Sequence, residues 1–298
     1  MQLNTLSKEG AILVTGGAGF IGSSLLISLK TKYPTTKLIS LDNYFTGTED
    51  NHIDGVTYIR GDTKNIKQLI TEPISLVFHL GEYSRVEASF HDTEKVFDFN
   101  LAGTSAVVDF CKNNYCKIVY AGSSTKFADG GTGRDQSPYA WTKAVNVELI
   151  KNNGSWFDLP YAIVYFYNVY GKKERSEGNY ATLIGIFKKH FEEKKPLPVV
   201  LPGTQKRNFT HVDDIVEGLI LAGEKGQGDD YHLGAKQSYS VIEVAKLFGE
   251  DIIFLPERKG NRMGGVLDTK KSEKELGWIA QKTLEEYILT IKNNAQGN

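Results

Sequence analysis

Short apolar runs alternate with amphipathic stretches over the first half of the chain. The runs cover residues 11–14, 37–41, 56–59, 76–80, 117–121 and 161–166, and they have the length and β-rich composition typical of buried strands. Apolar residues at helical spacing occupy residues 23–32, 94–113 and 137–152. Strands that alternate with helices predict right-handed crossovers and a doubly wound parallel sheet of the α/β class.

The alternation weakens after Gly171. Helices are expected there at residues 213–224, 240–248 and 284–293, with loops and shorter strands between them. A length of 298 residues suits one large domain or two unequal ones. We therefore predict a Rossmann domain over residues 1–171, with a return segment near 207–233, and a smaller mixed C-terminal domain for substrate over 172–298.

Composition narrows the class of protein and its location. Lys and Arg total 35 against 36 Asp and Glu, and this near-neutral balance argues against a dedicated nucleic-acid binder. Neither a membrane-spanning apolar run nor an N-terminal secretion signal is visible, and two cysteines cannot make a disulfide framework. The six histidines are scattered, so no metal site is predicted. A cytoplasmic protein that does not contact membranes is expected.

A glycine-rich turn follows the first strand and opens the first helix. Gly16, Gly19 and Gly22 recur every three residues, and the helix start carries Phe20 and Ile21. Free N–H groups and the helix dipole at such a turn favour a pyrophosphate. Asp42 ends the second strand 20 residues after Gly22, where a carboxylate can accept hydrogen bonds from the adenosine ribose. Because its charge repels a 2′-phosphate, NAD is predicted rather than NADP.

A phenol and an ammonium stand four residues apart at Tyr139 and Lys143. On a helix this spacing puts them on one face, where the ammonium can stabilise a phenolate for general acid–base chemistry. The strand that ends in Ala121, Gly122 and Ser123 lies just upstream and can direct hydroxyls into the same pocket.

Together these motifs resemble the extended short-chain dehydrogenase/reductase family, that is, the nucleotide-sugar epimerases and dehydratases. The resemblance runs almost from end to end, through TGGAGFIG, LDNYFTG, GD, FHL, SS, YAWTK, NVYG, GTQKRNFTHVDD and KELGW. It implies that Tyr139 is the catalytic base, that Lys143 holds the nicotinamide ribose and that Ser123 hydrogen-bonds the reacting sugar hydroxyl. It also implies a homodimer, formed through the helices at 94–113 and 139–152.

The resemblance further assigns residues to the two ligands. On NAD it places Asn43, Asp62, Thr63 and Leu80 in addition to the glycine turn and Asp42. From the residues alone, Asp62 either reaches the adenine edge or is an ordinary turn residue. Near the active site, the substrate phosphates and the nucleotide it places Asn100, Asn168 and Arg207. Ser124 and Thr125 are expected beside the substrate, and Arg207 and Arg262 offer guanidinium groups to its diphosphate.

Departures from the family pattern narrow the expected reaction. Relatives that dehydrate sugars carry an Asp-Glu pair after the active-site Ser or Thr, whereas this chain has Ser124 and Thr125. Hydroxyls cannot replace carboxylates as acid or base near neutral pH. We therefore predict an NAD-dependent epimerase acting at C4 of a nucleotide-linked hexose, of the UDP-glucose 4-epimerase type.

Two alternatives stay open. One is a 4-dehydrogenase or 4-keto reductase of a UDP-, GDP- or dTDP-linked sugar, and the remote one is a non-catalytic dinucleotide-binding protein.

The segment from Gly81 to Arg85 replaces the small residues common in relatives, and Lys126 replaces an apolar one. Glu82, Tyr83 and Lys126 are each either substrate contacts or ordinary surface residues.

Overall fold

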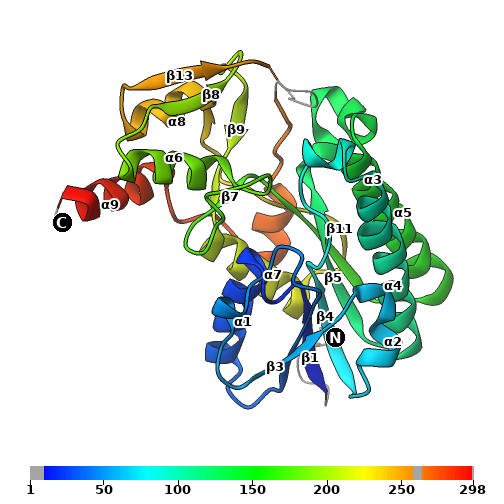
Figure 1. The fold of residues 1–298 in the computed structure, drawn as a ribbon. Helices are drawn as coiled ribbons and strands as arrows, with labels where there is room; N and C mark the ends of the chain where they lie inside the picture. Colours follow the sequence, from blue (N-terminus) through cyan, green and yellow to red (C-terminus); the bar gives the residue numbers. More distant parts are fainter. Residues whose placement is uncertain (1–9, 258–263, 297–298) are drawn as a thin grey trace.

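The computed structural model describes residues 10–257 and 264–296, and a seven-stranded sheet forms its centre (Figure 1). The strand order is β11-β6-β5-β4-β1-β2-β3, and every neighbouring pair is parallel. The strands are β1 (Ala11–Thr15), β2 (Leu38–Asp42), β3 (Val56–Arg60), β4 (Ile74–His79), β5 (Lys117–Ser123), β6 (Tyr161–Phe166) and β11 (Gly228–Leu233). This arrangement confirms the doubly wound α/β class.

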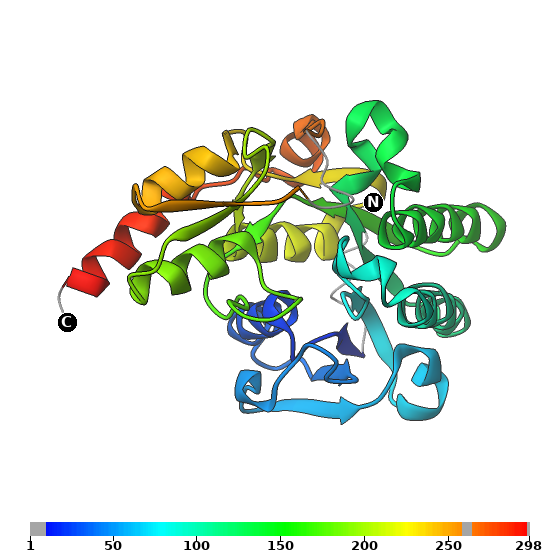
Figure 2. The same cartoon turned by 45° about the horizontal axis from the view of Figure 1, so that its top comes forward.

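Helices cover both faces of the sheet, which explains why its central strands are continuous apolar runs. On one face α1 (Phe20–Lys32) and α7 (Val212–Lys225) share a core with β1, β4 and β6. On the other face α2 (Ile66–Leu69), α4 (Gly103–Asn113) and α5 (Pro138–Phe157) share a core with β1, β4, β5 and β6. Figure 2 shows α4 and α5, in green, well away from α1, in blue. β1, β2, β4 and β5 are buried along their whole length, as two-sided cover requires.

The helix predicted over 94–113 is divided into three parts. It consists of α3 (Thr93–Val96), a π-helical stretch, η5 (Phe97–Ala102), and α4. Asn100 lies in the π-helical stretch, and its amide hydrogen-bonds the backbone of Tyr83 and the hydroxyl of Thr142. A local widening of this kind re-aims side chains without breaking the helix.

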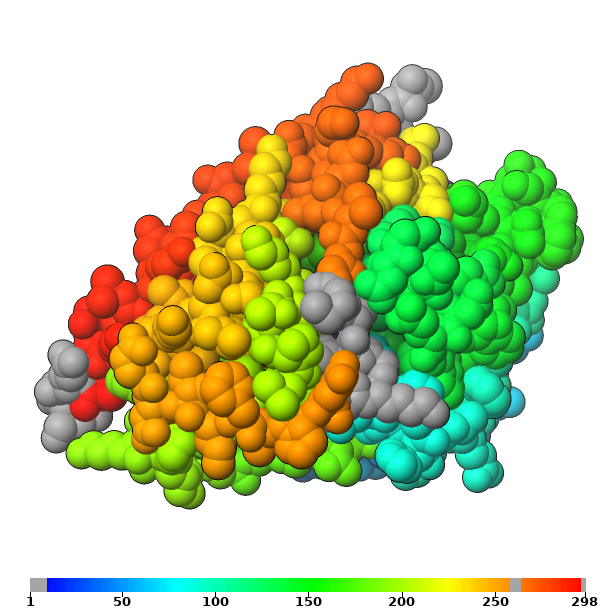
Figure 3. All heavy atoms as spheres, turned by 90° about the horizontal axis from the view of Figure 1, so that it is seen from above, coloured from blue at the N-terminus to red at the C-terminus, as the bar shows by residue number. Residues whose placement is uncertain are grey.

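A second, smaller core lies at the end of the molecule where the C-terminus is found (Figure 1). It is built from α6 (Leu183–Glu192), β8 (Leu197–Val200), α8 (Val241–Phe248), β13 (Ile252–Leu255) and α9 (Leu284–Gln296). Tyr170 of β7 (Val169–Tyr170) and Tyr239 of β12 (Ser238–Ser240) also belong to this core. β7 pairs with β10 (Thr210–His211), and β12 pairs with β9 (Lys206–Asn208). Figure 3 shows α9, in red, on the side opposite the green segment around α5.

The chain returns from the second core to the main sheet through α7 and β11, which pairs with β6. The boundary at residue 171 itself stays a prediction. Short turns complete the path at η2 (Glu49–Asn51), η3 (Thr63–Asn65), η4 (Ala88–Phe90), η6 (Ser124–Phe127), η7 (Asp129–Asp135) and η8 (Ser272–Leu276). Within residues 10–257 and 264–296, no helix has the length and apolarity needed to cross a membrane.

Candidate active site

The glycine turn between β1 and α1 is packed so closely that side chains would not fit. Gly16 has a positive φ of 74°, and a Cβ on Gly22 would lie 2.1 Å from the carbonyl oxygen of Gly16. Gly19 caps α1 without a side-chain hydrogen bond, and the first turn carries no acidic residue. The first N–H groups of α1, those of Phe20, Ile21 and Gly22, precede the helical hydrogen-bond ladder, and these residues line the cleft as an anion-binding cradle.

Asp42 lies beside this cradle at the carboxyl end of β2. One carboxylate oxygen accepts the N–H of Ala18 at 2.9 Å and the other accepts the N–H of Tyr44 at 2.7 Å. Burial raises the pKa of Asp42 above its ordinary value, while these two N–H donors and the charge of Arg60 oppose the rise. The carboxylate is thus fixed in orientation and keeps lone pairs for a ribose.

The residues predicted to bind the cofactor beside Asp42 differ in whether they line the cleft. Thr63 and Asn43 line the cleft, whereas Asp62 is not among its lining residues. Asp62 instead accepts a hydrogen bond of 2.8 Å from the amide of Asn43. Asp62 is therefore placed to orient Asn43 at the cleft.

The predicted catalytic side chains converge from two elements on this cleft. Ser137 caps α5 by accepting the N–H of Ala140 at 3.1 Å, with Pro138 in the first helical position. Tyr139 and Lys143 follow on the first turns of α5, and Ser123 ends β5. The Ser123 hydroxyl oxygen accepts hydrogen bonds from the hydroxyl and the N–H of Thr125, at 2.9 and 3.3 Å. Ser123 can therefore direct its own proton into the cleft.

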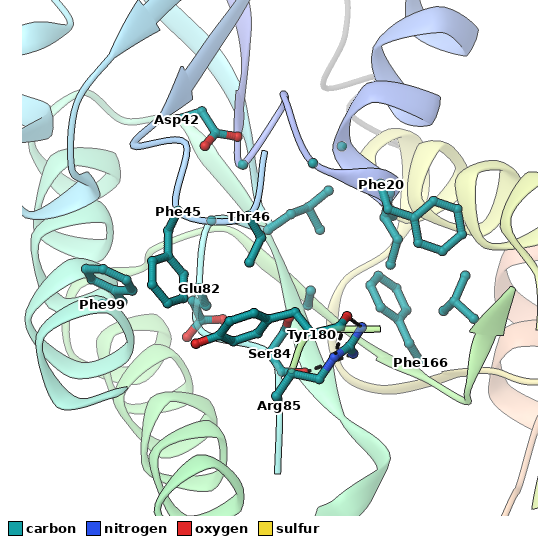
Figure 4. A pocket seen from close by; sticks show the side chains of 18 of the residues that line it. Phe20, Asp42, Phe45, Thr46, Glu82, Ser84, Arg85, Phe99, Phe166 and Tyr180 are labelled. Carbon is teal, nitrogen blue, oxygen red and sulfur yellow. Dashed lines mark hydrogen bonds between the residues drawn. The ribbon is translucent and has the colours of Figure 1, made fainter. Parts of the chain in front are cut away.

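The cleft has a volume of about 570 Å³ and runs along the carboxyl ends of the strands. It brings together most of the predicted site residues, namely Gly16, Gly19, Phe20, Ile21, Gly22, Asp42, Asn43, Thr63, Leu80, Ser123, Ser124, Thr125, Tyr139, Lys143 and Asn168. Figure 4 shows Asp42 at one end, Phe20 and Phe166 at another side, and Tyr180 across the middle.

A second cleft of about 360 Å³ adjoins the first, and the two share Arg85, Asn168 and Thr182 among their lining residues. Arg207 lines this second cleft from β9. Arg262 lies outside the described residues. Asn100 is fully buried and does not line either of these clefts, so its place near the active site is that of a scaffold residue.

Cations that were not assigned a role from the sequence also line the main cleft. They are Arg85, Lys173 and Arg175. Arg85 hydrogen-bonds the carbonyl of Tyr180 through two nitrogens (Figure 4), and Arg175 donates to the carbonyl of Thr46 at 3.0 Å. These contacts draw the segment after β7 across the cleft, a long-range arrangement without a local sequence signal.

The structure also shows the surroundings of Glu82, Tyr83 and Lys126, whose roles the sequence left open. Glu82 lines the cleft and forms an ion pair with Lys143. Tyr83 is buried and hydrogen-bonds Asp92, and Lys126 donates to the hydroxyl of Tyr165 at 3.2 Å. Neither Tyr83 nor Lys126 lines the main cleft. Of these three residues, Glu82 alone is in a position to influence the chemistry.

Comparison with known proteins identifies the family. The model of the NAD dependent epimerase/dehydratase family matches residues 12–234. This chain belongs to that family. The match covers the glycine turn, Asp42, Ser123, Tyr139, Lys143 and the return strand β11.

Individual relatives carry names from both branches of the family. A trifunctional UDP-glucose 4,6-dehydratase/UDP-4-keto-6-deoxy-D-glucose 3,5-epimerase/UDP-4-keto-L-rhamnose-reductase of Arabidopsis thaliana is 28% identical over 95% of this chain, which spans only 46% of that protein. A Methanocaldococcus jannaschii protein, provisionally named a UDP-glucose 4-epimerase, is 29% identical over 96% of this chain and 99% of its own length.

The fold is shared with solved structures. A UDP-glucose 4-epimerase from Thermotoga maritima, crystallised with UDP-glucose, matches with a TM-score of 0.87 at 23% identity. The match covers 96% of this chain and 99% of the other. This likeness establishes a common Rossmann-like fold.

NAD is the cofactor of the family, and solved structures of this fold carry it. The residues of this chain fit the group. The tight turn at Gly16 and Gly22, where a Cβ would collide with backbone, sets the N-terminus of α1 at the cleft for a pyrophosphate, and the fixed carboxylate of Asp42 stands where ribose hydroxyls need an acceptor.

Proposed function

We propose that this protein is an epimerase that inverts C4 of a nucleotide-linked hexose, with NAD as its resident cofactor. The observation that carries the proposal is the composition of the cleft. Ser123, Tyr139 and Lys143 line it together with the glycine cradle, while Ser124 and Thr125 occupy the positions at which dehydration needs carboxylates.

The chain's own residues supply the proton chemistry. Tyr139 takes the proton of the C4 hydroxyl as the sugar is oxidised and gives it back when the sugar is reduced. Ser123 donates a hydrogen bond to the same oxygen and so holds it next to the phenol. Lys143 contributes a positive charge that stabilises the phenolate and can hold the nicotinamide ribose. When bound, NAD supplies reversible hydride transfer at C4.

Dehydration needs a further acid and base at C5 and C6, and two observations argue against it. Ser124 and Thr125 stand where dehydratases carry carboxylates. Among the described lining residues the only carboxylates are Asp42, at the cofactor cradle, and Glu82. The Glu82 carboxylate already accepts hydrogen bonds from Thr104, Tyr120 and Asn146 and pairs with Lys143, so it is not poised to move protons at a sugar.

Nucleotide-sugar recognition is proposed for the two adjoining clefts. Arg207 and Asn168 face the second cleft, and Arg85 lies between the two, within electrostatic reach of Tyr139. Planar guanidinium groups match diphosphate oxygens in pairs. The relation to a structure crystallised with UDP-glucose supports a UDP-sugar as the first substrate to test.

A homodimer in the cytoplasm completes the proposal. Phe97 and Trp141 are 40% and 38% exposed and meet edge to face at 5.8 Å between ring centres. They lie on η5 and α5, the pair of helices expected to meet a second copy. The buried thiols of Cys111 and Cys116 are free, which suits a reducing compartment.

The reaction is tested by incubating the purified protein in D₂O with UDP-glucose or UDP-N-acetylglucosamine, and with GDP- and dTDP-linked hexoses. We expect a C4 epimer that retains its C6 oxygen and carries no deuterium at C5. A 6-deoxy product or deuterium at C5 would refute the assignment. Steady accumulation of NADH, followed at 340 nm, would favour a one-way 4-dehydrogenase instead.

Tyr139→Phe provides the matched test of the base. We expect turnover to fall by about 10²- to 10⁴-fold, the usual contribution of a positioned acid–base group, with NAD binding retained. Tyr115→Phe makes the same chemical change at a residue that is 83% exposed, and it should leave turnover unchanged. Turnover of Tyr139→Phe close to that of the unmodified protein would exclude Tyr139 as the base.

A further inference from the structure

The Glu82–Lys143 pair is buried beneath the reacting end of the cleft. The side chain of Glu82 is 1% exposed and that of Lys143 is 7% exposed. The ammonium pairs with one carboxylate oxygen of Glu82 and also donates to the carbonyl of Ala121 at 2.6 Å. Because 61 residues separate the two side chains, the contact is a product of the tertiary fold.

The second oxygen of Glu82 is surrounded by donors. It accepts hydrogen bonds from Thr104 and Tyr120 at 3.0 Å each and from the amide of Asn146 at 2.9 Å. A carboxyl group that receives four donors, one of them an ammonium ion, is held in its ionised form, because a protonated oxygen would have to donate rather than accept. The four donors therefore stabilise a negative charge on the carboxylate of Glu82.

A chain of buried side chains fixes the direction of these hydrogen bonds. Thr15 accepts the N–H groups of Leu80 and Gly81, so its hydroxyl donates to Nδ1 of His79 at 2.7 Å. Burial lowers the pKa of His79 to about 4, which leaves the ring neutral with its proton on Nε2. His79 then donates to Thr104 at 2.9 Å, and Thr104 donates to Glu82. The chain ends on the carboxylate.

Lys117 shows what burial does to a lysine that has no carboxylate partner among the described residues. Its ammonium lies against the carbonyls of Ala222, Gly223 and Gly226, at 2.8, 2.9 and 2.6 Å. Burial lowers its pKa to about 8, because carbonyl dipoles do not replace the lost hydration of the ion. Lys143 is buried to a similar degree and differs in having Glu82 as its partner.

We propose that Glu82 is a positioning residue that holds Lys143 in the cleft as an ammonium ion, anchored for its work on Tyr139 and the nicotinamide ribose. The inference rests on the function proposed above for Lys143. The ionisable groups near the pair include His79 of β4, Tyr120 of β5 and Tyr139 of α5, and Arg85 lines the same cleft from the loop after β4. Glu82 supplies the negative charge in this group.

The test measures Lys143 directly, so it does not depend on knowing the substrate. The Cε chemical shifts of Lys143 and Lys117 are followed against pH by NMR in the NAD-bound protein, with Lys143→Met to assign the signal. In Glu82→Gln we expect the Lys143 midpoint to fall toward that of Lys117. The Lys117 midpoint should not move, which makes it the internal control.

Unmodified protein provides a second test that stands even if Glu82→Gln does not fold. The Cε signal of Lys143 should still be that of an ammonium ion at the pH where the Lys117 signal has moved, because Lys143 has a carboxylate partner and Lys117 lies against carbonyls. A Lys143 midpoint at or below that of Lys117, or one unchanged in Glu82→Gln, overturns the proposal.

Turnover against pH then separates this inference from the proposed function. With UDP-glucose, or whichever nucleotide hexose is turned over, Glu82→Gln should lose at least tenfold more kcat at pH 9 than at pH 6.5, relative to the unmodified protein. A shifted Lys143 midpoint with an unchanged kcat profile would support the role of Glu82 and refute the role of Lys143.

Discussion

Asp42→Asn tests the cofactor site most directly, because it changes one charge and almost no volume. The carboxylate is 7% exposed and accepts the N–H groups of Ala18 and Tyr44 at 2.9 and 2.7 Å. An asparagine keeps one acceptor oxygen but presents an NH₂ group to the other N–H donor. Leaving a buried donor unsatisfied costs about 1–3 kcal/mol of stability, which a melting curve can register.

The cost to NAD follows from the same geometry. With both oxygens already turned toward backbone donors, the remaining lone pairs are what a ribose can use. Losing one charge-assisted hydrogen bond costs about 1.5–3 kcal/mol, which raises the Kd for NAD by roughly 10- to 150-fold. The affinity for NADP should fall less than that for NAD, or rise, because the charge that repels its 2′-phosphate disappears.

The assay is titration calorimetry with NAD and NADP on protein freed of nucleotide. Asp50→Asn is the matched control, because Asp50 is exposed on the same rim and bonds only locally to Thr48 in the described contacts. We expect the preference for NAD over NADP to fall at least tenfold in Asp42→Asn and to hold in Asp50→Asn. An unchanged preference in a variant that melts normally would show that Asp42 does not read the ribose.

Three further changes follow from the structure. Gly22→Ala places a Cβ 2.1 Å from a backbone oxygen of its own turn, whereas the Cβ of Gly19→Ala lies 3.2 Å from that oxygen. Gly22→Ala should therefore weaken NAD binding more than Gly19→Ala, and equal Kd values for the two variants would contradict this. Trp141→Lys should give monomers in sedimentation at micromolar concentration while Trp156→Lys stays dimeric; a monomeric unmodified protein would rule out the dimer. Burial raises the pKa of Glu174 to about 7, so its contribution to stability is present below about pH 4.5 and is lost as pH rises through 7. The melting temperature of Glu174→Gln should therefore fall less between pH 5 and pH 8 than that of the unmodified protein. Equal falls in the two proteins would refute this.

The order of elements and the cofactor turn were predictable because their signals are local. A strand buried on both faces needs a continuous apolar run, and a pyrophosphate cradle needs small residues at fixed spacing before a helix. Gly16, Gly22 and Asp42 therefore stand out in the sequence as they do in the cleft. The i, i+4 spacing of Tyr139 and Lys143 depends only on the helix that carries them.

Other predictions needed a correction that only packing supplies. Helical periodicity over 94–113 does not reveal the π-helical stretch. Asn100 in that stretch contacts Tyr83 and Thr142 on other elements, and local periodicity carries no information about such distant contacts. The sequence likewise left Glu82 and Lys126 equivalent as polar replacements. Glu82 lies buried at the wall of the cleft and pairs with Lys143, whereas Lys126 contacts Tyr165 away from it.

What the sequence alone determined is thus the set of elements, the family resemblance and the residues whose chemistry depends on short spacing. The tertiary structure decided which distant groups meet. Parallel strands in the order β11-β6-β5-β4-β1-β2-β3 bring their carboxyl ends to one edge, so the loop after β4 and helix α5 face the same space. That convergence pairs Glu82 with Lys143, because a buried ammonium ion is stable only where the fold delivers a partner for its charge.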